Sequence, residues 1–169
     1  MVAPAPEPAQ DEEAATAAAV QVSETVAVDE TSRHAFDLFV SYASEDRSIV
    51  EELVGVLEKR NLKVWWDKGQ ITLGDRLSAK IDEGLRSSRY GVVIISHSFI
   101  AKNWPENELR SMINRSISKD EKVILPVLVG LTHDQIAAHY PLITDTVTTV
   151  FDGNFNRLAD EITAAIRHG

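Results

Sequence analysis

Cysteine is absent from this 169-residue chain, which excludes disulfide bonds, thiolate metal ligands and a cysteine nucleophile. Long apolar runs are absent as well, since none approaches the roughly 18 residues that a membrane-spanning helix needs. The N-terminus also lacks the basic region and the continuous apolar core of a signal peptide. We therefore expect a cytoplasmic protein without a membrane span.

Lysine and arginine are absent from residues 1–32, where seven acids give a local charge of −7. This segment is rich in alanine and contains Pro4, Pro6 and Pro8 but no aromatic residue, so it has little to bury. We interpret residues 1–32 as a disordered acidic tail or linker, and residues 33–169 as one folded domain. The remaining 19 of the 26 acids there are set against all 17 Lys and Arg residues, and this near-neutral balance gives no nucleic-acid footprint.

Apolar strand-like segments alternate with helical patterns along the domain. Strands are expected at 36–42, 62–66, 92–96, 122–129 and 146–151, and Pro126 predicts a bulge or an unpaired position in the fourth. The first helix, which Ser44 or Asp46 can cap, has an apolar stripe of Val50, Leu53, Val54 and Leu57. This alternation predicts an α/β fold, a flavodoxin-like doubly wound five-stranded parallel sheet in the order 2-1-3-4-5 with helices on both faces.

The strongest functional indication follows the third strand. Asn103 can cap a helix there, with Pro105 near its first position, and Trp104 and Glu108 are four residues apart. At that spacing the indole and the carboxylate share one face of a helical turn, close to an N-terminus that favours an ionised carboxylate. Strand tips that feed helices are also where open α/β folds bind ligands. The alternative is a core tryptophan beside a solvated glutamate that only complements the helix dipole.

Several common sites are excluded by their missing residues. The loop 69–76 has the glycine spacing of a phosphate-binding P-loop, but Asp75-Arg76 stands where Lys-Ser/Thr is required. The third strand ends in Ser96, not in the lone aspartate of a phosphoacceptor receiver, and no Gly-x-Gly-x-x-Gly follows the first strand. No glycine elbow frames a serine nucleophile, and no two histidines lie at i, i+4. We therefore expect neither a hydrolase triad nor a metal site.

Polar and aromatic side chains gather where the first three strands end. Aromatic faces, carboxylates and hydroxyls suit a nucleoside, because rings stack on rings and carboxylates accept hydrogen bonds from ribose hydroxyls. The alternative is that the tryptophans are core residues, since strand alternation sends Trp65 and Trp66 to opposite faces. The expected ring consists of Ser41, Tyr42, Ser44, Asp46, Trp66, Asp67, Ser98, Trp104 and Glu108.

Three motifs together resemble a TIR (Toll/interleukin-1 receptor) domain, closest to the bacterial and plant branches. They are the segment Phe36–Asp46, the loop after Trp66-Asp67, and Ser98-Phe-x-x-x-x-Trp104-Pro-x-x-Glu108-Leu109. The resemblance covers about residues 34–168 and implies the flavodoxin-like fold. It also implies an enzyme that breaks the nicotinamide–ribose bond of NAD+ and releases ADP-ribose or a cyclised isomer of it. NAD+ is then the substrate, and no further cofactor is expected.

The resemblance implies roles for individual residues. Glu108 is the expected catalytic carboxylate, Tyr42 lines the nicotinamide side, and Trp104 stacks on a ring. The other expected substrate-binding residues are Ser41, Ala43, Asp46, Asp67 and Ser98. A fixed carboxylate suits this reaction because the ribose becomes oxocarbenium-like, as in glycoside cleavage.

The resemblance also implies a second role, in self-association. TIR domains pair through the loop after the second strand, here Lys68–Leu77, in which Gly74, Asp75 and Arg76 are the expected contact residues. The alternative function is a non-catalytic interaction module for other copies or other TIR domains, or a secreted mimic of host adaptors. The loop lacks the Pro-Gly element of animal adaptors, which favours the enzyme, in bacterial defence or virulence. Enzymatic TIR domains commonly act only when assembled, so the two roles are compatible.

Overall fold

The computed structural model describes residues 34–116, 124–146 and 149–168. They all belong to the second of the two units, residues 1–33 and 34–169, into which contacts divide the chain. The expected tail 1–32 lies outside the described residues, so its disorder and the domain start at residue 33 stay predictions. Among the described helices, none combines the length and the hydropathy needed to cross a membrane.

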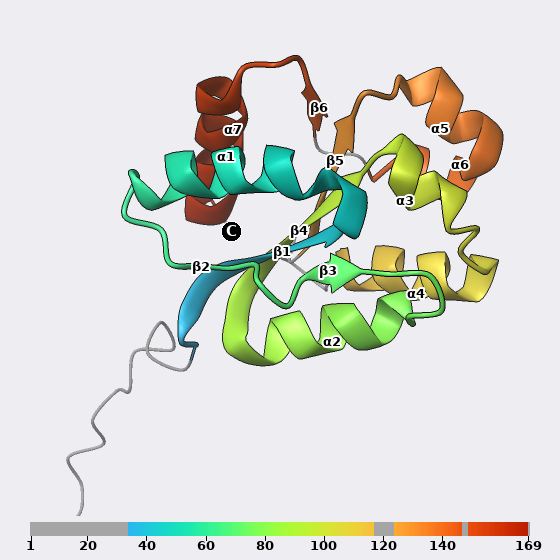
Figure 1. The fold of residues 1–169 in the computed structure, drawn as a ribbon, viewed down its shortest axis with the longest axis horizontal. Helices are drawn as coiled ribbons and strands as arrows, with labels where there is room; N and C mark the ends of the chain where they lie inside the picture. The colour runs from blue at the N-terminus through green and yellow to red at the C-terminus, as the bar shows by residue number, and fades with distance from the viewer. Residues whose placement is uncertain (1–33, 117–123, 147–148, 169) are drawn as a thin grey trace, which may run out of the picture. The chain divides into compact units, whose positions relative to one another are not determined.

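A sheet of six parallel strands lies at the centre of this unit (Figure 1). The strands pair in the order β2-β1-β4-β5-β6, and β3 also pairs with β1. This is the predicted order 2-1-3-4-5 with one short strand added, so the doubly wound fold is confirmed and the count of five is wrong. The strands are β1 Phe36–Ala43, β2 Val64–Trp65, β3 Gln70–Ile71, β4 Ser88–Ile95, β5 Ile124–Val129 and β6 Thr149–Phe151.

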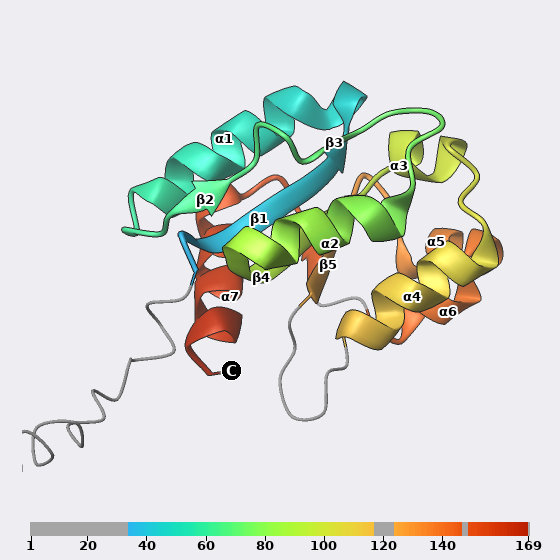
Figure 2. The same ribbon diagram turned by 90° about the horizontal axis from the view of Figure 1, so that it is seen from below.

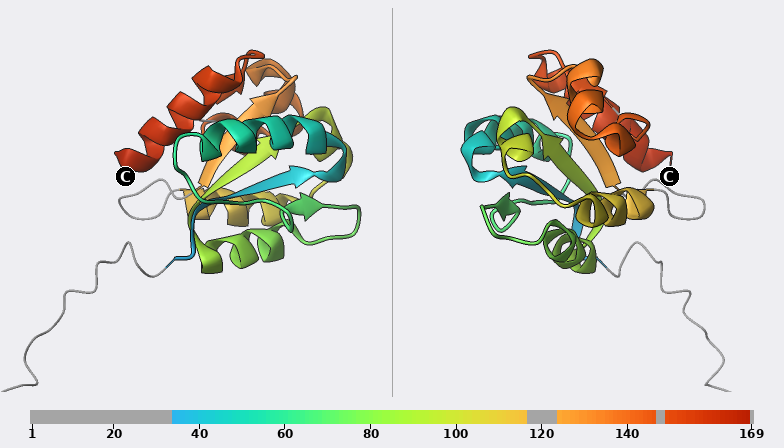
Figure 3. Two further views of the ribbon diagram at one scale, coloured as in Figure 1. Left: turned by 60° about the vertical axis from the view of Figure 1, so that its left-hand side comes forward. Right: turned by 90° about the vertical axis from the view of Figure 1, so that its right-hand side faces the viewer.

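Helices cover both faces of the sheet, as predicted. Helices α1 and α7 lie on one face, and α2 and α4 lie on the other (Figures 1 and 2). Figure 3 (right) looks toward the end of the sheet where the strands finish, and α3, α5 and α6 lie there. The helices are η2 Ser44–Asp46, α1 Arg47–Glu58, α2 Leu77–Ser87, α3 His97–Ala101, α4 Glu106–Ser116, α5 His133–His139, α6 Pro141–Thr144 and α7 Phe155–Arg167.

The sheet separates two apolar cores, because successive side chains of a strand point to opposite faces. On β1, Leu38, Val40 and Tyr42 belong to the core under α1 and α7. Phe39 belongs to the other core, under α2 and α4. The predicted apolar stripe of α1 is fully confirmed, since Val50, Leu53, Val54 and Leu57 are all buried in the first core.

The extra strand β3 arises where a loop was expected. Gln70 and Ile71 pair with the last two residues of β1, and the side chain of Ile71 is completely buried. A Cβ atom on Gly69 would lie 1.8 Å from the backbone oxygen of Val40. Only glycine therefore lets the chain return to the sheet edge at that point.

Strand β4 begins at Ser88, four residues before the predicted start at Val92. Tyr90 and Gly91 were expected to bound the strand, but both lie inside it. A Cβ atom on Gly91 would lie 2.4 Å from atoms of the Phe39 ring, so this glycine makes room for an aromatic ring of the neighbouring strand.

The short helix α3 was not expected. Ser96 caps it by accepting a hydrogen bond from the Phe99 N–H at 3.1 Å. Asn103 follows the helix with a left-handed φ of 50°, a conformation that asparagine tolerates at helix C-termini. The prediction that Asn103 caps the following helix is therefore wrong, and α4 begins directly after Pro105.

Pro126 lies in β5 without a bulge, because the pairing register with β4 runs unbroken from Ile124 to Leu128. Its pairing with β6 is described from Val127 onward. The predicted bulge is therefore wrong, while the predicted unpaired position stays a prediction, because residues 147 and 148 lie outside the described part. The second and last predicted strands, 62–66 and 146–151, are shorter than expected; residues 147 and 148 lie outside the described part.

Candidate active site

Glu108 is nearly buried in the first turn of α4, and its carboxylate is bound to the start of α2. One oxygen accepts a hydrogen bond from the backbone N–H of Ser78 at 2.9 Å, and the other lies 3.4 Å from Nε of Arg76. Arg76 is the N-cap residue of α2 and makes no capping bond with its own side chain. Glu108 therefore supplies an acceptor that the N-terminus of α2 would otherwise lack.

These contacts keep Glu108 ionised. The Ser78 hydroxyl and backbone N–H, followed by Arg76, hold the pKa of Glu108 below its usual value against the opposing effect of burial. The Arg76 side chain is 77% exposed, so water screens its share. The alternative of a solvated glutamate is wrong, and the site contains a fixed, buried negative charge.

Trp104 is buried beside α4 and does not share a helical turn with Glu108, because α4 begins two residues after it. Its ring packs against Phe99 with the centroids 5.6 Å apart, and its backbone N–H donates to the Tyr140 hydroxyl at 3.1 Å. Its exposed edge lines a cavity of about 430 Å³ with Tyr140 and Leu142. Tyr140 was missed because it lies 36 residues away and no local pattern connects it to Trp104.

Tyr42 lies on the opposite face of the sheet from Trp104. Its ring is 6.3 Å from that of Trp66, and Arg47 lies over Trp66 at 5.4 Å. Burial raises the pKa of Tyr42. Asp67 is exposed at the end of β2 and acts electrostatically on Tyr42. Together these residues form an aromatic and charged cluster at the edge under α1.

The predicted ring is therefore divided between the two faces of the sheet. Trp66 packs on the core under α1, whereas Trp65 packs on the core under α2, as the alternative reading expected. By the same alternation Ser41 and Ala43 point to the face that carries Glu108. Ser98 lies half-buried on α3. The Ser44 hydroxyl donates a hydrogen bond to the carboxylate of Glu45, the next residue in the chain.

The carboxylate of Asp46 is hydrogen-bonded within the protein, to the end of β4. Its buried carboxylate accepts a hydrogen bond from the Ser96 hydroxyl at 2.5 Å, and burial raises its pKa. Asp46 stands at the N-cap position of α1, as predicted, but neither its side chain nor that of Ser44 makes a capping hydrogen bond. The role of Ser96 as a helix cap could have been expected from the sequence, because a serine stands there between a strand and a helix.

Two expected substrate-binding residues carry a buried polar atom without a hydrogen-bond partner in the described part of the chain. They are Ser41, through its hydroxyl, and Trp104, through its indole N–H. Buried polar atoms in folded proteins are almost always paired. Unpaired ones at the ends of the strands are suited to a ligand that supplies the missing partners.

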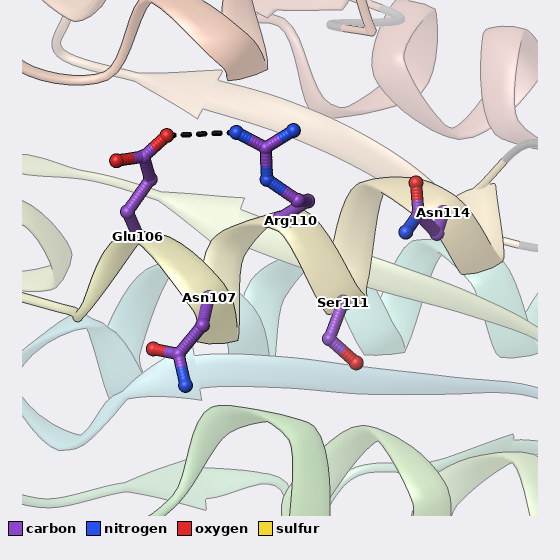
Figure 4. A pocket seen from close by; sticks show the side chains of 5 residues that line it. All are labelled: Glu106, Asn107, Arg110, Ser111 and Asn114. Carbon is purple, nitrogen blue, oxygen red and sulfur yellow. Dashed lines mark hydrogen bonds and ion pairs between the residues drawn. The ribbon is translucent and has the colours of Figure 1, made fainter.

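A second hollow lies on the outer face of α4 (Figure 4). Glu106 and Arg110 form an ion pair at 2.8 Å there, and Asn107 and Ser111 point away from that pair. Its lining residues in the described part of the chain all come from this one helix, and Glu108 is not among them. We therefore place the candidate site around Glu108 instead. Among the described residues, no group of three acids or histidines could hold a metal ion.

Residues 38–165 match the family described as TIR domain. The chain belongs to this family. The region matched runs from most of β1 to most of α7, and so includes Glu108, Trp104 and the loop before α2.

This TIR domain is similar to prokaryotic proteins with named activities. It is 42% identical to the 2′ cyclic ADP-D-ribose synthase BtTIR of Bacteroides thetaiotaomicron over 111 residues, 65% of this chain and 38% of the relative. It is 37% identical to the NAD(+) hydrolase TcpC of Escherichia coli O6:H1 over 123 residues, 71% of this chain and 40% of the relative. The chain spans about two fifths of the length of the curated relatives it matches.

Solved structures of low identity share its fold. A metazoan TIR-STING receptor from C. gigas, in complex with 2′,3′-cGAMP, has a TM-score of 0.57 at 21% identity and covers 79% of this chain and 40% of its own. The TIR domain of the Toll-related receptor TRR-2 from Hydra magnipapillata has a TM-score of 0.50 at 20% identity and covers 78% of this chain and 98% of its own. At these identities the likeness shows the fold alone.

The loop before α2 of this TIR domain is a fixed turn. The Asp75 carboxylate accepts hydrogen bonds from the N–H and the hydroxyl of Thr72, at 2.8 and 2.9 Å, and the Thr72 N–H is the main cause of its lowered pKa. Gly74 takes a φ of 94°, which favours glycine. Between them Leu73 is 82% exposed. The loop thus holds a large apolar side chain in the solvent.

Proposed function

We propose that this TIR domain cleaves the bond between nicotinamide and ribose in NAD+, with Glu108 as the catalytic carboxylate. The observation that carries the proposal is a buried carboxylate kept ionised beside the ends of the central strands. The names of the relatives, an NAD(+) hydrolase and a 2′ cyclic ADP-D-ribose synthase, support the same substrate. NAD+ is a substrate in this proposal, and the reaction needs no resident cofactor.

The chemistry follows from the charge that develops on the ribose. The bond from C1′ to the nicotinamide nitrogen breaks, its electron pair stays on that nitrogen, and the sugar becomes oxocarbenium-like. An ionised Glu108 stabilises this positive charge. Water then adds to C1′ and loses a proton to give ADP-ribose, or a hydroxyl of the same molecule adds to give a cyclic isomer.

Glu108 can accept hydrogen bonds from a substrate. Its oxygens accept from the Ser78 N–H and lie beside Nε of Arg76, and a carboxylate has about four acceptor positions in all. Arg76 is the easier of the two donors to displace, because its contact is longer and its side chain is solvated. Ribose hydroxyls therefore bind Glu108 beside these donors or in place of Arg76.

We expect Glu108→Gln to lower NAD+ turnover at least about 100-fold, because the amide cannot neutralise the developing charge. The fold should persist, since the amide oxygen still accepts from the Ser78 N–H. Nicotinamide release measures turnover, at high protein concentration with a crowding agent, and thermal unfolding checks the fold. Glu106→Gln is the matched control, because Glu106 lies in the same turn but is 71% exposed. A Glu108→Gln protein as active as wild type would refute the proposal.

A non-catalytic interaction module is the second candidate function. The exposed Leu73 favours it, and so does the fact that Glu108 already has a structural role as an acceptor for α2. In that case neither wild type nor Glu108→Gln would consume NAD+, although both would associate. Nicotinamide release separates the candidates, and sedimentation of the same samples shows that both proteins were assembled when turnover was measured.

A further inference from the structure

Helix α3 is tied at both of its ends to the short segment that follows β1. At its N-cap the Ser96 hydroxyl donates to Asp46, and at its C-cap Lys102 pairs with Glu45, the residue before Asp46. The ammonium of Lys102 lies 3.3 and 3.2 Å from the two carboxylate oxygens of Glu45. We call Glu45, Asp46, Ser96 and Lys102 the α3 clamp. Two consecutive acids thus hold the two ends of one helix.

Helix α3 depends on such contacts because it is only five residues long. Helices shorter than about 12 residues are marginal by themselves, since nucleation fixes several residues for few hydrogen bonds. Most of the stability of so short a helix must therefore come from its packing and its polar contacts with the rest of the domain. The α3 clamp supplies one polar contact at each end.

Lys102 is the buried member of its ion pair. Its side chain is 7% exposed, whereas the cation of every other ion pair in the described residues is at least 22% exposed. The charge of Lys102 also acts to lower the pKa of both Asp46 and Asp75, so the ammonium lies among three carboxylates. A buried charge is costly to leave without a partner, so this pair is fixed more firmly than a surface ion pair.

The α3 clamp leads directly to Trp104. Phe99 of α3 is completely buried, and its ring packs against the Trp104 ring with the centroids 5.6 Å apart. Lys102 stands two residues before Trp104, and Asn103 between them has the left-handed φ of 50°. The indole is thus connected to α3 both by packing and through the chain. The Glu108 carboxylate, by contrast, is bound to α2.

We propose that Glu45 and Lys102 are positioning residues, which fix α3 and thereby hold the Trp104 ring where the substrate stacks on it. Neither residue touches the substrate in this proposal. The inference rests on the proposed function for its substrate, NAD+, whereas the position of Trp104 can be measured without turnover. Because Glu108 is held by α2, the α3 clamp affects substrate binding and leaves the chemical step largely unchanged.

Kinetics of Glu45→Gln and Lys102→Met test the proposal, because each substitution removes the ion pair and keeps most of the side chain. We expect each to raise the KM for NAD+ roughly two- to tenfold, as for the loss of one aromatic contact, with kcat changed less than about twofold. The double variant should resemble Lys102→Met, because the pair is already broken there. Nicotinamide release at varied NAD+ concentration measures both constants.

Asp160→Asn is the matched control. The Arg60–Asp160 pair likewise joins a partly buried cation to an exposed carboxylate, at 2.7 Å, but it connects α1 to α7. Its loss should leave the KM for NAD+ unchanged. Thermal unfolding checks the fold of every variant. Glu45 is 56% exposed, so Glu45→Gln carries the test if Lys102→Met does not fold.

The sign of the Glu45→Gln effect separates the α3 clamp from direct binding of substrate by Lys102. If the ammonium bound the diphosphate of NAD+, its release from Glu45 would lower KM or leave it unchanged, and only Lys102→Met would raise KM. That result would overturn the proposal. So would effects of the two substitutions that simply add, or a loss of kcat at constant KM.

Fluorine NMR measures the position of Trp104 without turnover. The chain has three tryptophans, so the full chain labelled with 5-fluorotryptophan gives three signals, and Trp104→Phe assigns one of them. We expect Glu45→Gln and Lys102→Met to shift or broaden the Trp104 signal, and Asp160→Asn to leave it in place. An unchanged signal in both clamp variants would overturn the proposal. The spectra give this answer even if wild type does not cleave NAD+, which distinguishes a failure of the clamp from a failure of the proposed function.

Discussion

The two buried carboxylates Glu108 and Asp46 have pKa values that are shifted in opposite directions. Donors at the start of α2 hold the pKa of Glu108 below its usual value, so its ionised form stabilises the fold. That stability is present above the unfolded pKa and is lost as pH falls through the folded one. Asp46 is the reverse, because burial raises its pKa and its ionisation destabilises the fold. The Ser96 hydroxyl and Lys102 oppose this rise, and Glu45 adds to it.

The sign for Asp46 gives a pH-dependent prediction. Ionising it costs stability progressively from about pH 4, the unfolded pKa of aspartate, upward through its raised folded pKa. Asp46→Asn removes this cost and can still accept from Ser96. We expect wild type to lose stability relative to Asp46→Asn as pH rises through that window. Urea unfolding of both proteins from pH 4 to 7 measures the difference, and a difference that is constant with pH would contradict the argument.

At the scale of elements, the glycines of α1 and α2 differ in how much space lies beside them. Gly84 of α2 faces the Phe39 ring, and a Cβ atom there would lie 2.5 Å from the ring atoms. Gly55 of α1 has no such neighbour within 4 Å. A methyl group at position 84 would therefore meet the Phe39 ring, whereas one at position 55, away from the buried stripe of α1, would meet open space. Substitution by alanine at the two positions should therefore have opposite signs.

We expect Gly55→Ala to raise the free energy of unfolding by about 0.5–1 kcal/mol, because alanine is the better helix former. Gly84→Ala should lower it by about 1–3 kcal/mol, because the packed ring cannot move aside without strain. Each protein serves as the control for the other in urea unfolding. Stabilisation by both substitutions would show that α2 can shift away from Phe39.

At the scale of the whole molecule, charge and assembly are connected. Residues 1–32 carry −7 of the formal −9, so the segment adds like charge to every copy that joins an assembly. The domain itself is nearly neutral and offers little repulsion. Assembly of the full chain should therefore depend on salt more than assembly of the domain.

We expect a chain of residues 33–169 to self-associate more tightly than the full chain at about 0.01 M salt, where charges act over roughly 30 Å. The difference should vanish near 1 M salt, where the range falls to about 3 Å. Sedimentation of both chains across this range measures it. Equal association at low salt would show that the acidic segment does not influence assembly.

The sequence by itself determined the parts of this protein that depend on local periodicity and on residue type. Apolar spacing predicted the stripe of α1, apolar runs predicted the main strands, the alternation of strands with helices predicted their order, and the TIR motifs marked Glu108. These features are readable because each residue's burial follows from its own element. The sequence did not show that Tyr42 and Trp104 lie on opposite faces of the sheet, because Trp104 lies outside the strands and its place depends on how the helices pack.

Only the tertiary structure decided which groups meet. Glu108 of α4 binds Ser78 of α2, 30 residues away, and Trp104 before α4 binds Tyr140 between α5 and α6, 36 residues away. Such contacts depend on how closely the elements approach one another. Single residues can decide that distance: Gly69, for example, lets the chain pass close enough to β1 for β3 to pair with it. The TIR motifs thus marked the carboxylate, while packing of α4 against α2 fixed its charge state and its partners.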